Sequence, residues 1–303
     1  MSSPYHFTNI TPAQISLTSE KSKSKSGQER TKITCTDTKT DWKLTVEGAN
    51  MSVIFEDMGP DGTLGKFGIT DERAANYSLT LVGGVIPEHL DAAKDAATRA
   101  HIAKSLAEQE TFFEFVRGIA DKGVEFMMNE GLLKKKVDES RKMATKLFKG
   151  APDAEAKVEE YILDNILAGA TIPIGLDDRT GNETLKMKQR LCKWAPEGES
   201  AVRNVVRIFA HDGVKFKRVE NTKICRYDWV RPTIVFNFWS TPSAYGVSAE
   251  IKSILLLRQG PGDSGSSMPS MSVPDLPPVA IKENTEEMDA AAEPSLKRAK
   301  TSE

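Results

Sequence analysis

Two long apolar stretches between residues 223 and 257 constrain the fold more than any other part of this chain. From Thr233 to Trp239, the letters TIVFNFW place one isoleucine and two phenylalanines on one side and valine, asparagine and tryptophan on the other. This period of two is typical of a β-strand. Turn-forming residues 240–244 separate it from a second strand-like stretch, Tyr245 to Leu256. We therefore predict a long hairpin that forms the spine of a larger sheet.

The rest of the chain divides into strand-like and helical regions. Residues 42–83 and 171–231 are rich in strand formers, and residues 86–168 have apolar residues at helical spacing. We expect one long or broken helix with interruptions near Gly118, Gly123 and Gly131, and a short helix over 155–167. The glycine-rich segment GPDGTLGKFGI lacks the GK[ST] ending of a P-loop, so we interpret it as a long turn between strands.

Both ends of the chain are polar. After a possible short strand at residues 5–10, the alternating Ser and Lys residues before position 34 predict a mobile basic loop. Residues 261–303 hold 8 acidic and 4 basic residues among many Pro, Gly and Ser, which predicts a disordered acidic tail. Such a tail can compete with nucleic acid for a basic groove, dock on partners such as replication proteins, or only aid solubility. It ends in a basic cluster that is a candidate nuclear-import signal: Lys297, Arg298 and Lys300.

Cysteine, histidine and hydropathy patterns exclude several classes of protein. Cys35, Cys192 and Cys225 lie far apart and in no CxxC, which indicates a reducing compartment and no disulfide framework. The four His are scattered, so local spacing predicts no metal site and no cofactor. No nucleophile elbow, kinase set or zinc-protease motif is present, so we expect no enzyme activity. The start lacks the pattern of a signal peptide, and no run approaches the ~20 apolar residues that span a membrane.

Basic faces on the predicted strands are the most distinctive feature of the sequence. Residues 185–231 contain 12 Lys and Arg but only 5 Asp and Glu. In LKMKQRLCKW, Lys186, Lys188 and Arg190 fall opposite an apolar face, and Lys215 and Lys217 do the same in GVKFKRV. Solvated lysines are common on strands, so each of these alone carries little weight. Two such faces in one β-rich region favour a track for a phosphate backbone.

Flat aromatic rings accompany these cations. Lys193 lies beside Trp194, Trp42 beside Lys43, and Arg226 and Tyr227 shortly precede Trp229. Cations that follow phosphates and rings that stack on bases are the chemistry of single-stranded nucleic-acid binding, although tryptophans also often belong to a core. The candidate binding residues are Lys186, Lys188, Arg190, Lys193, Trp194, Lys215, Lys217, Arg226, Tyr227, Trp229, Trp42, Lys43, Lys66, Phe67 and Tyr77.

The sequence resembles the phage-type single-stranded DNA-binding proteins that also occur in large eukaryotic DNA viruses. The resemblance rests on Lys66-Phe67-Gly68-Ile69, on Asn76 to Leu81, and on Trp239 followed by Tyr245 to Lys252, within about residues 42–257. It implies an OB-fold that binds single strands in replication, recombination and repair, often as a dimer. The expected architecture is an α+β, β-rich chain: an OB-fold-like antiparallel barrel over 1–260 with a helical insertion at about 86–168, and a tail over 261–303.

Two departures from the family pattern stand out. The tail finishes in PSLKRAKTSE rather than in acidic residues, and the helical insertion is long. The function expected is non-enzymatic, sequence-nonspecific binding of single-stranded DNA in a host nucleus or viral replication site, and RNA remains an alternative partner. A virion or scaffold protein, in which the basic faces contact other copies, is the competing hypothesis.

Overall fold

A computed structural model describes residues 4–11, 14–23, 29–38, 43–56, 76–83, 91, 93–178, 181–190, 206–211, 215–219, 224–241 and 243–259. The strands are β1 (Tyr5–His6), β2 (Ile15–Lys23), β3 (Glu29–Asp37), β4 (Val46–Glu47), β5 (Met51–Glu56), β6 (Asn76–Gly83), β7 (Ile174–Leu176), β8 (Glu183–Arg190), β9 (Arg207–His211), β10 (Phe216–Val219), β11 (Trp229–Ser240) and β12 (Tyr245–Arg258). The helices are the 3-10 turn η1 (Phe7–Asn9), α2 (Ala96–Asn129), α3 (Lys134–Leu147) and α4 (Ala154–Ala168).

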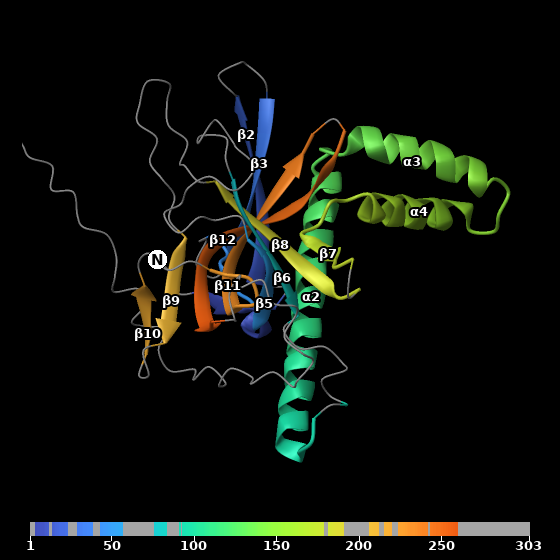
Figure 1. The fold of residues 1–303 in the computed structure, drawn as a ribbon. Helices are drawn as coiled ribbons and strands as arrows, with labels where there is room; N and C mark the ends of the chain where they lie inside the picture. Colours follow the sequence, from blue (N-terminus) through green and yellow to red (C-terminus); the bar gives the residue numbers. More distant parts are fainter. Residues whose placement is uncertain are drawn as a thin grey trace, which may run out of the picture.

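The hairpin of β11 and β12 is the spine of the sheet, as the sequence predicts. Its antiparallel register runs from Trp229 opposite Arg258 to Ser240 opposite Tyr245. β11 also pairs with β3, β4 and β5, and β12 pairs with β8 and β9. All strands described belong to one sheet of 12 strands (Figure 1). The expectation of a β-rich α+β fold is therefore confirmed at the level of class.

Five strands of this sheet are paired in a closed circuit. β5 pairs with β6, β6 with β8, β8 with β12, β12 with β11, and β11 with β5. The circuit is not purely antiparallel, because β12 runs parallel to β8 and to β9. Parallel neighbours need a long crossover connection, and the chain between β8 and β12 provides one. The prediction of a wholly antiparallel arrangement is corrected to a mixed sheet.

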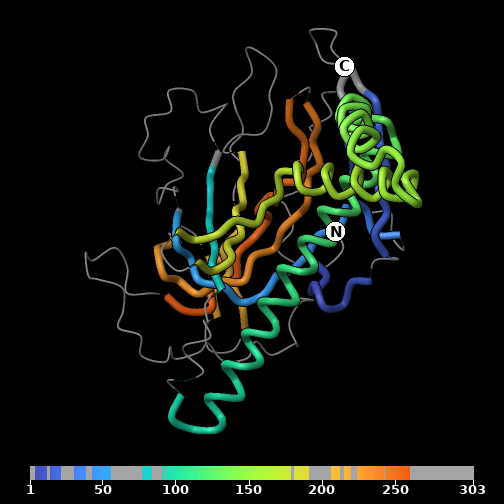
Figure 2. The backbone as a smooth tube through the Cα atoms, turned by 90° about the vertical axis from the view of Figure 1, so that its right-hand side faces the viewer, coloured from blue at the N-terminus to red at the C-terminus, as the bar shows by residue number. Residues whose placement is uncertain are grey.

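The long helix α2 packs across the sheet. Figures 1 and 2 show it running along one side of the strands and continuing past them. Phe112, Val116 and Met127 are buried in the same core as Phe236 and other inward residues of β11 and β12. This core combines the inward face of the strands with one face of the helix, as expected for an amphipathic helix on a sheet.

Only one of the three expected helix interruptions occurs. α2 continues through Gly118 and Gly123 and ends next to Gly131, which has a φ of +71°. At this end, the amide of Leu132 donates to the carbonyl of Met127, so Gly131 forms a left-handed helix cap. Gly123 is retained inside the helix because a Cβ there would lie 2.0 Å from a ring carbon of Phe238.

The serine- and lysine-rich N-terminal stretch forms more structure than the sequence predicts. β2 and β3 pair over nine residues each, from Ile15 opposite Asp37 to Lys23 opposite Glu29. The expected loop is thereby corrected to a two-stranded ribbon, of which 24–28 are outside the described residues. The inward residues Ile15, Ile33 and Cys35 are buried and stabilise its base, while the polar residues account for the misleading pattern.

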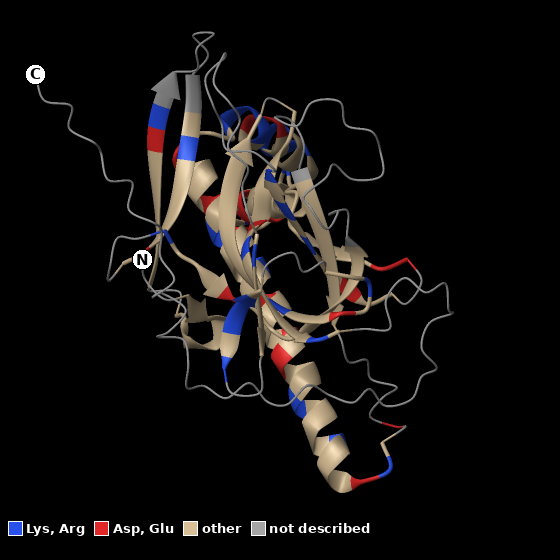
Figure 3. Ribbon diagram, turned by 60° about the vertical axis from the view of Figure 1, so that its left-hand side comes forward, with Lys and Arg blue, Asp and Glu red and all other residues tan. Residues whose placement is uncertain are grey.

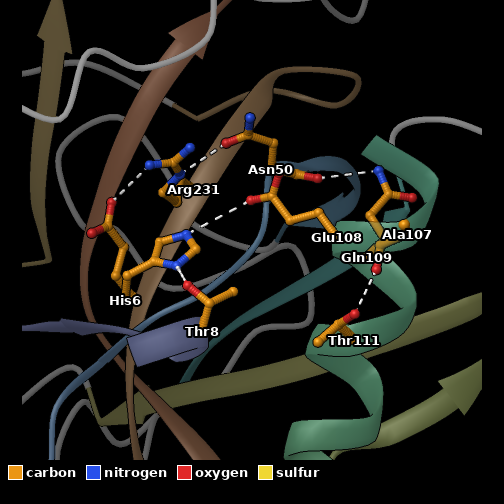
Figure 4. Close-up of polar contacts among 9 residues, drawn as sticks. His6, Thr8, Asn50, Ala107, Glu108, Gln109, Thr111 and Arg231 are labelled. Atoms are coloured by element: carbon orange, nitrogen blue, oxygen red, sulfur yellow. Dashed lines mark hydrogen bonds and ion pairs between the residues drawn. The ribbon is translucent and has the colours of Figure 1, made fainter. Parts of the chain in front are cut away.

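A polar network connects the N-terminal segment, the sheet and α2 (Figure 4). Arg231 on β11 donates from Nε to Asn50 Oδ1 at 2.9 Å and from Nη1 to Glu47 Oε1 at 3.2 Å. The ring of His6 lies 3.7 Å from Glu108 of α2. Contact with this ring is the main reason that the pKa of Glu108 lies below its ordinary value. The network connects residues at the place where β4, β5 and β11 meet.

Candidate nucleic-acid interface

The outward face of β8 carries the predicted row of cations. Leu185 and Met187 are buried, whereas Lys186, Lys188 and Arg190 are exposed. This alternation confirms the period of two on which the prediction was based. Lys and Arg are marked in blue on the strands in Figure 3. The residue type and direction of these three side chains suit contact with an extended anion.

An exposed aromatic side chain lies on the same face as these cations. In the register of the sheet, Phe55 of β5 is opposite Thr80 of β6, and Thr80 is opposite Lys186 of β8. Two residues along each strand, and so on the same face, Ser78 is opposite Lys188. Neighbouring strands lie about 4.8 Å apart, so the Cα atoms of Phe55 and Lys186 are about 10 Å apart. With 45% of its surface exposed, Phe55 is free to contact a ligand.

A β-bulge explains why sequence patterning misses Phe55. Strict alternation from Met51 and Val53, both buried, would place Phe55 in the core. The pairing between β5 and β6 shifts by one residue between Val53 and Phe55, so that Ile54 has no partner opposite. Such an extra residue sends the following side chain to the other face. The letters MSVIFE contain no cluster of polar residues that would have indicated this register shift.

Arg226 and Tyr227, two of the predicted binding residues, lie beside β5 and are half-buried. The amide of Tyr227 donates to the carbonyl of Val53 at 2.7 Å, two residues from Phe55. The guanidinium of Arg226 lies 4.9 Å from the centroid of the Tyr227 ring, which is cation–π geometry. Tyr227 has a φ of +71°, which is uncommon for a residue with a side chain and often marks functional sites.

Two predicted stacking residues are buried, and their assignment is corrected. Tyr77 is 1% exposed because it alternates with Leu79 on the inward face of β6. Trp229 is 5% exposed and packs with Ala93 and Ile102 in a separate small cluster. Neither ring is accessible to a base in this structure. Of the predicted aromatic residues in the described part of the chain, Tyr227 alone is left partly exposed.

Lys43 lies in a polar cluster on the outward side of β11 and β12. Its Nζ donates to Asn237 Oδ1 at 3.2 Å, and Asn237 Nδ2 donates to Glu250 Oε2 at 2.9 Å. Lys252 forms an ion pair with Glu250. Burial lowers the pKa of Lys43, although the nearby Glu250 opposes that shift. Glu250 is in register with Lys188, so this cluster continues the face of β8 across β12.

The remaining predicted residues are placed elsewhere or fall outside the described part of the chain. Lys217 is exposed on β10, which is separated from β8 by β12 and β9, and Lys215 precedes that strand. The structure therefore does not bring these two together with Lys186. Residues that lie outside the described part are Trp42, Lys66, Phe67, Lys193, Trp194, Lys297, Arg298 and Lys300, together with the whole of 260–303.

In the described part of the chain, no group of three or more His, Cys, Asp or Glu residues is arranged to hold a metal ion. No described helix has the length and apolar character that crossing a bilayer requires. The features that distinguish this surface are its cations and the exposed ring of Phe55.

Comparison with known proteins gives only distant structural matches. No family model matches the chain, and no curated protein matches its sequence. Among solved structures, gp2.5, a single-stranded DNA-binding protein encoded by bacteriophage T7, is 12% identical, with a TM-score of 0.37 over 75% of this chain and 98% of that protein. The single-stranded DNA-binding protein from bacteriophage Enc34, in complex with single-stranded DNA, is 13% identical, with a TM-score of 0.33 over 72% and 89%. At these scores the likeness carries no argument about function.

Proposed function

We propose that this chain is a non-enzymatic protein that binds single-stranded DNA without regard to sequence. The observation that carries the proposal is the row of Phe55, Thr80 and Lys186 across three strands, with Lys188 and Arg190 on the same face. A ring that stacks on bases beside cations that follow phosphates supplies both parts of single-strand binding. Arg226 and Tyr227 extend this face at the far edge of β5.

The closed circuit of strands supports naming the fold as an OB-type barrel. In chain order, its strands are β5, β6, β8, β11 and β12, and its second and third strands are β6 and β8. OB-folds bind oligonucleotides on the face of their second and third strands. The cations of β8 and the small polar residues of β6 lie there. Roles in replication, recombination and repair, at a viral replication site or in a host nucleus, are part of the proposal.

A salt titration of the full-length protein tests the proposal. We expect tight binding to oligo-dT, weaker binding to duplex DNA, and a logarithm of affinity that falls linearly with the logarithm of salt concentration. The variant Lys186→Ala/Lys188→Ala removes two phosphate contacts, so the slope should decrease in magnitude by about 1.4, or ~0.7 for each contact. Fluorescence anisotropy with labelled oligonucleotides measures both quantities. An RNA oligonucleotide in the same series determines which nucleic acid is preferred.

A matched control uses two lysines far from this face. The variant Lys134→Ala/Lys135→Ala changes the net charge equally, but on exposed positions of α3, so its salt slope should match that of the unmodified protein. Equal slopes for both variants would show that net charge alone attracts the oligonucleotide. Equal affinity for duplex and single strands would argue against single-strand binding and for the competing structural role.

A further inference from the structure

Four polar side chains form a cluster on the outward side of β11 and β12, next to the cations of β8. We call it the Glu250 cluster; its members are Lys43, Asn237, Glu250 and Lys252. Glu250 of β12 is in register with Lys188 of β8, and β11 is the next strand beyond β12. Neighbouring strands lie about 4.8 Å apart, so β11 lies about 10 Å from β8. An extended ligand that contacts β8 can therefore reach this cluster.

The carboxylate of Glu250 is at the centre of the cluster. Asn237 Nδ2 donates to its Oε2 at 2.9 Å, and Lys252 donates to its Oε1. Asn237 also accepts a hydrogen bond from Lys43 Nζ, through its Oδ1 and at 3.2 Å. Each oxygen of the carboxylate thus has a donor, and the amide of Asn237 links the carboxylate to a second lysine.

Positive charge is in excess around this carboxylate. Burial alone would raise the pKa of Glu250, but hydrogen bonds from Lys252 and Asn237 hold it below its ordinary value. Glu250 is therefore ionised at neutral pH. One negative charge faces three ammonium groups, which belong to Lys43, Lys188 and Lys252. The surroundings of Glu250 can therefore accommodate a further anion.

The polar groups of the cluster are accessible from solvent. Lys43 is exposed, and the side chains of Lys252 and Glu250 are 38% and 27% exposed. Ile251, between these two residues, points the other way and is buried in the main core. The strand thus keeps its charged side chains on the open surface, where an incoming anion can contact them.

An aromatic ring lies beside the cluster. Trp239 comes two residues after Asn237, so both side chains are on the same side of β11. Trp239 is partly exposed, whereas Phe238 between them is buried. Gly246 is opposite Trp239 in the hairpin and has no side chain that could cover the indole. Cations and an accessible indole therefore occur together here, as they do in sites that bind single strands.

Carboxylates and phosphates are recognised by the same donors. Both present anionic oxygens that accept charge-assisted hydrogen bonds from ammonium and amide groups. We propose that the donors of the Glu250 cluster form a second phosphate-binding subsite of the single-strand interface. A phosphate there takes over the hydrogen bonds that Glu250 accepts in the free protein, and Trp239 stacks on a neighbouring base. The inference rests on the proposed binding of single-stranded DNA, whose strand continues from β8 across β12 to β11.

Neutralising Glu250 tests whether its carboxylate competes with phosphate. Glu250→Gln keeps the size of the side chain, and it should lower the Kd for oligo-dT about 1.5- to 5-fold, the range for one partly exposed charge contact. Glu139→Gln is the matched control, because it changes the net charge equally at an exposed position of α3 and should leave the Kd unchanged. Fluorescence anisotropy with an oligo-dT of about 16 nucleotides, the upper end of the site size of one OB-fold, measures both.

The cations and the indole are tested separately. Lys43→Gln/Lys252→Gln removes two phosphate contacts, so the salt slope should decrease in magnitude by about 1.4, or ~0.7 for each contact. Trp239→Leu should raise the Kd about 5- to 150-fold, whereas Trp239→Phe keeps a flat ring and should bind more tightly than Trp239→Leu. Urea unfolding of each full-length variant separates a loss of binding from a loss of the fold.

The outcomes distinguish this inference from the proposed function. If Lys186→Ala/Lys188→Ala weakens binding but the variants of the Glu250 cluster leave the Kd and the salt slope unchanged, the function stands and the second subsite is overturned. If Glu250→Gln binds more weakly than the unmodified protein, the carboxylate does not compete with phosphate, and the inference is also overturned. If the unmodified chain does not bind oligo-dT, both the function and the subsite are refuted.

Discussion

The role of Phe55 can be tested by removing its flat ring while keeping its volume. Phe55→Leu retains an apolar side chain of similar size at the bulge of β5, so the stability of the fold should change by less than about 1.5 kcal/mol. Leucine has no π-face to stack on a base. Base–aromatic stacking contributes about 1–3 kcal/mol for each base, so the Kd for single-stranded DNA should rise by about 5- to 150-fold.

The assay is fluorescence anisotropy with an oligo-dT of about 12 nucleotides, within the site size of one OB-fold. Phe55→Trp should bind at least as tightly as the unmodified protein, because it keeps an aromatic face in the same place. Leu147→Ala is the matched control. It also truncates a strongly exposed apolar side chain, 65% exposed on α3, but away from the open face, and should leave the Kd unchanged.

Combining Phe55→Leu with Lys186→Ala sharpens the test. Thr80 lies between the two residues in the register, so they are about 10 Å apart and do not touch. Their free-energy effects on binding should then add to within about 0.5 kcal/mol. If Phe55→Leu binds as tightly as the unmodified protein, the ring does not stack on DNA and the assignment of this face to base contact is refuted.

Two further predictions concern stability. Gly123→Ala should lower the free energy of unfolding by about 1–3 kcal/mol, because the new Cβ would lie 2.0 Å from the buried ring of Phe238. Gly118→Ala should raise the free energy of unfolding by about 0.5–1 kcal/mol, because nothing lies within 4 Å of the new Cβ. Urea unfolding measures both changes, and two changes of the same sign would contradict the packing around Gly123. The lowered pKa of Glu108 beside His6 stabilises the fold above about pH 4.3, and this contribution is lost as the pH falls through the folded-state pKa. The stability difference between Glu108→Gln and the unmodified protein should therefore shrink on acidification, and a difference independent of pH would disprove the contribution.

Periodicity predicted those parts of the structure that depend on local sequence. The alternation in β8 placed Lys186 and Lys188 outward because that strand buries one face. The pattern of TIVFNFW correctly placed Phe236 inward, but Val235 on the opposite side of β11 is buried too. The alternation of apolar and polar residues no longer indicates which side chains are buried after the register between two strands shifts. For this reason the bulge beside Phe55 was invisible in the sequence.

Burial of aromatic residues was the other limit of sequence reasoning. Trp229 lies near Arg226 in the sequence, and this proximity suggested a stacking platform, whereas Tyr77 lies in a segment that carries the family resemblance. Whether a ring faces solvent depends on what packs over it, and Trp229 is covered by Ala93 and Ile102, which are more than a hundred residues away in the chain. Tyr227, by contrast, is held beside β5 by a backbone hydrogen bond that no residue pattern reveals.

The position of the β11–β12 hairpin in the chain has a consequence for how the protein folds. β11 contacts β5, and β12 contacts β8, so the circuit of strands lacks two neighbouring members until residues 229–258 have been synthesised. Most pairings of this circuit are therefore of long sequence separation, which predicts slow folding. Until the hairpin is synthesised, β5 and β8 lack these partners along one edge, and exposed edges favour aggregation. The segment that organises the sheet is thus also the last part of it to be synthesised, and the edges of the earlier strands stay exposed until then.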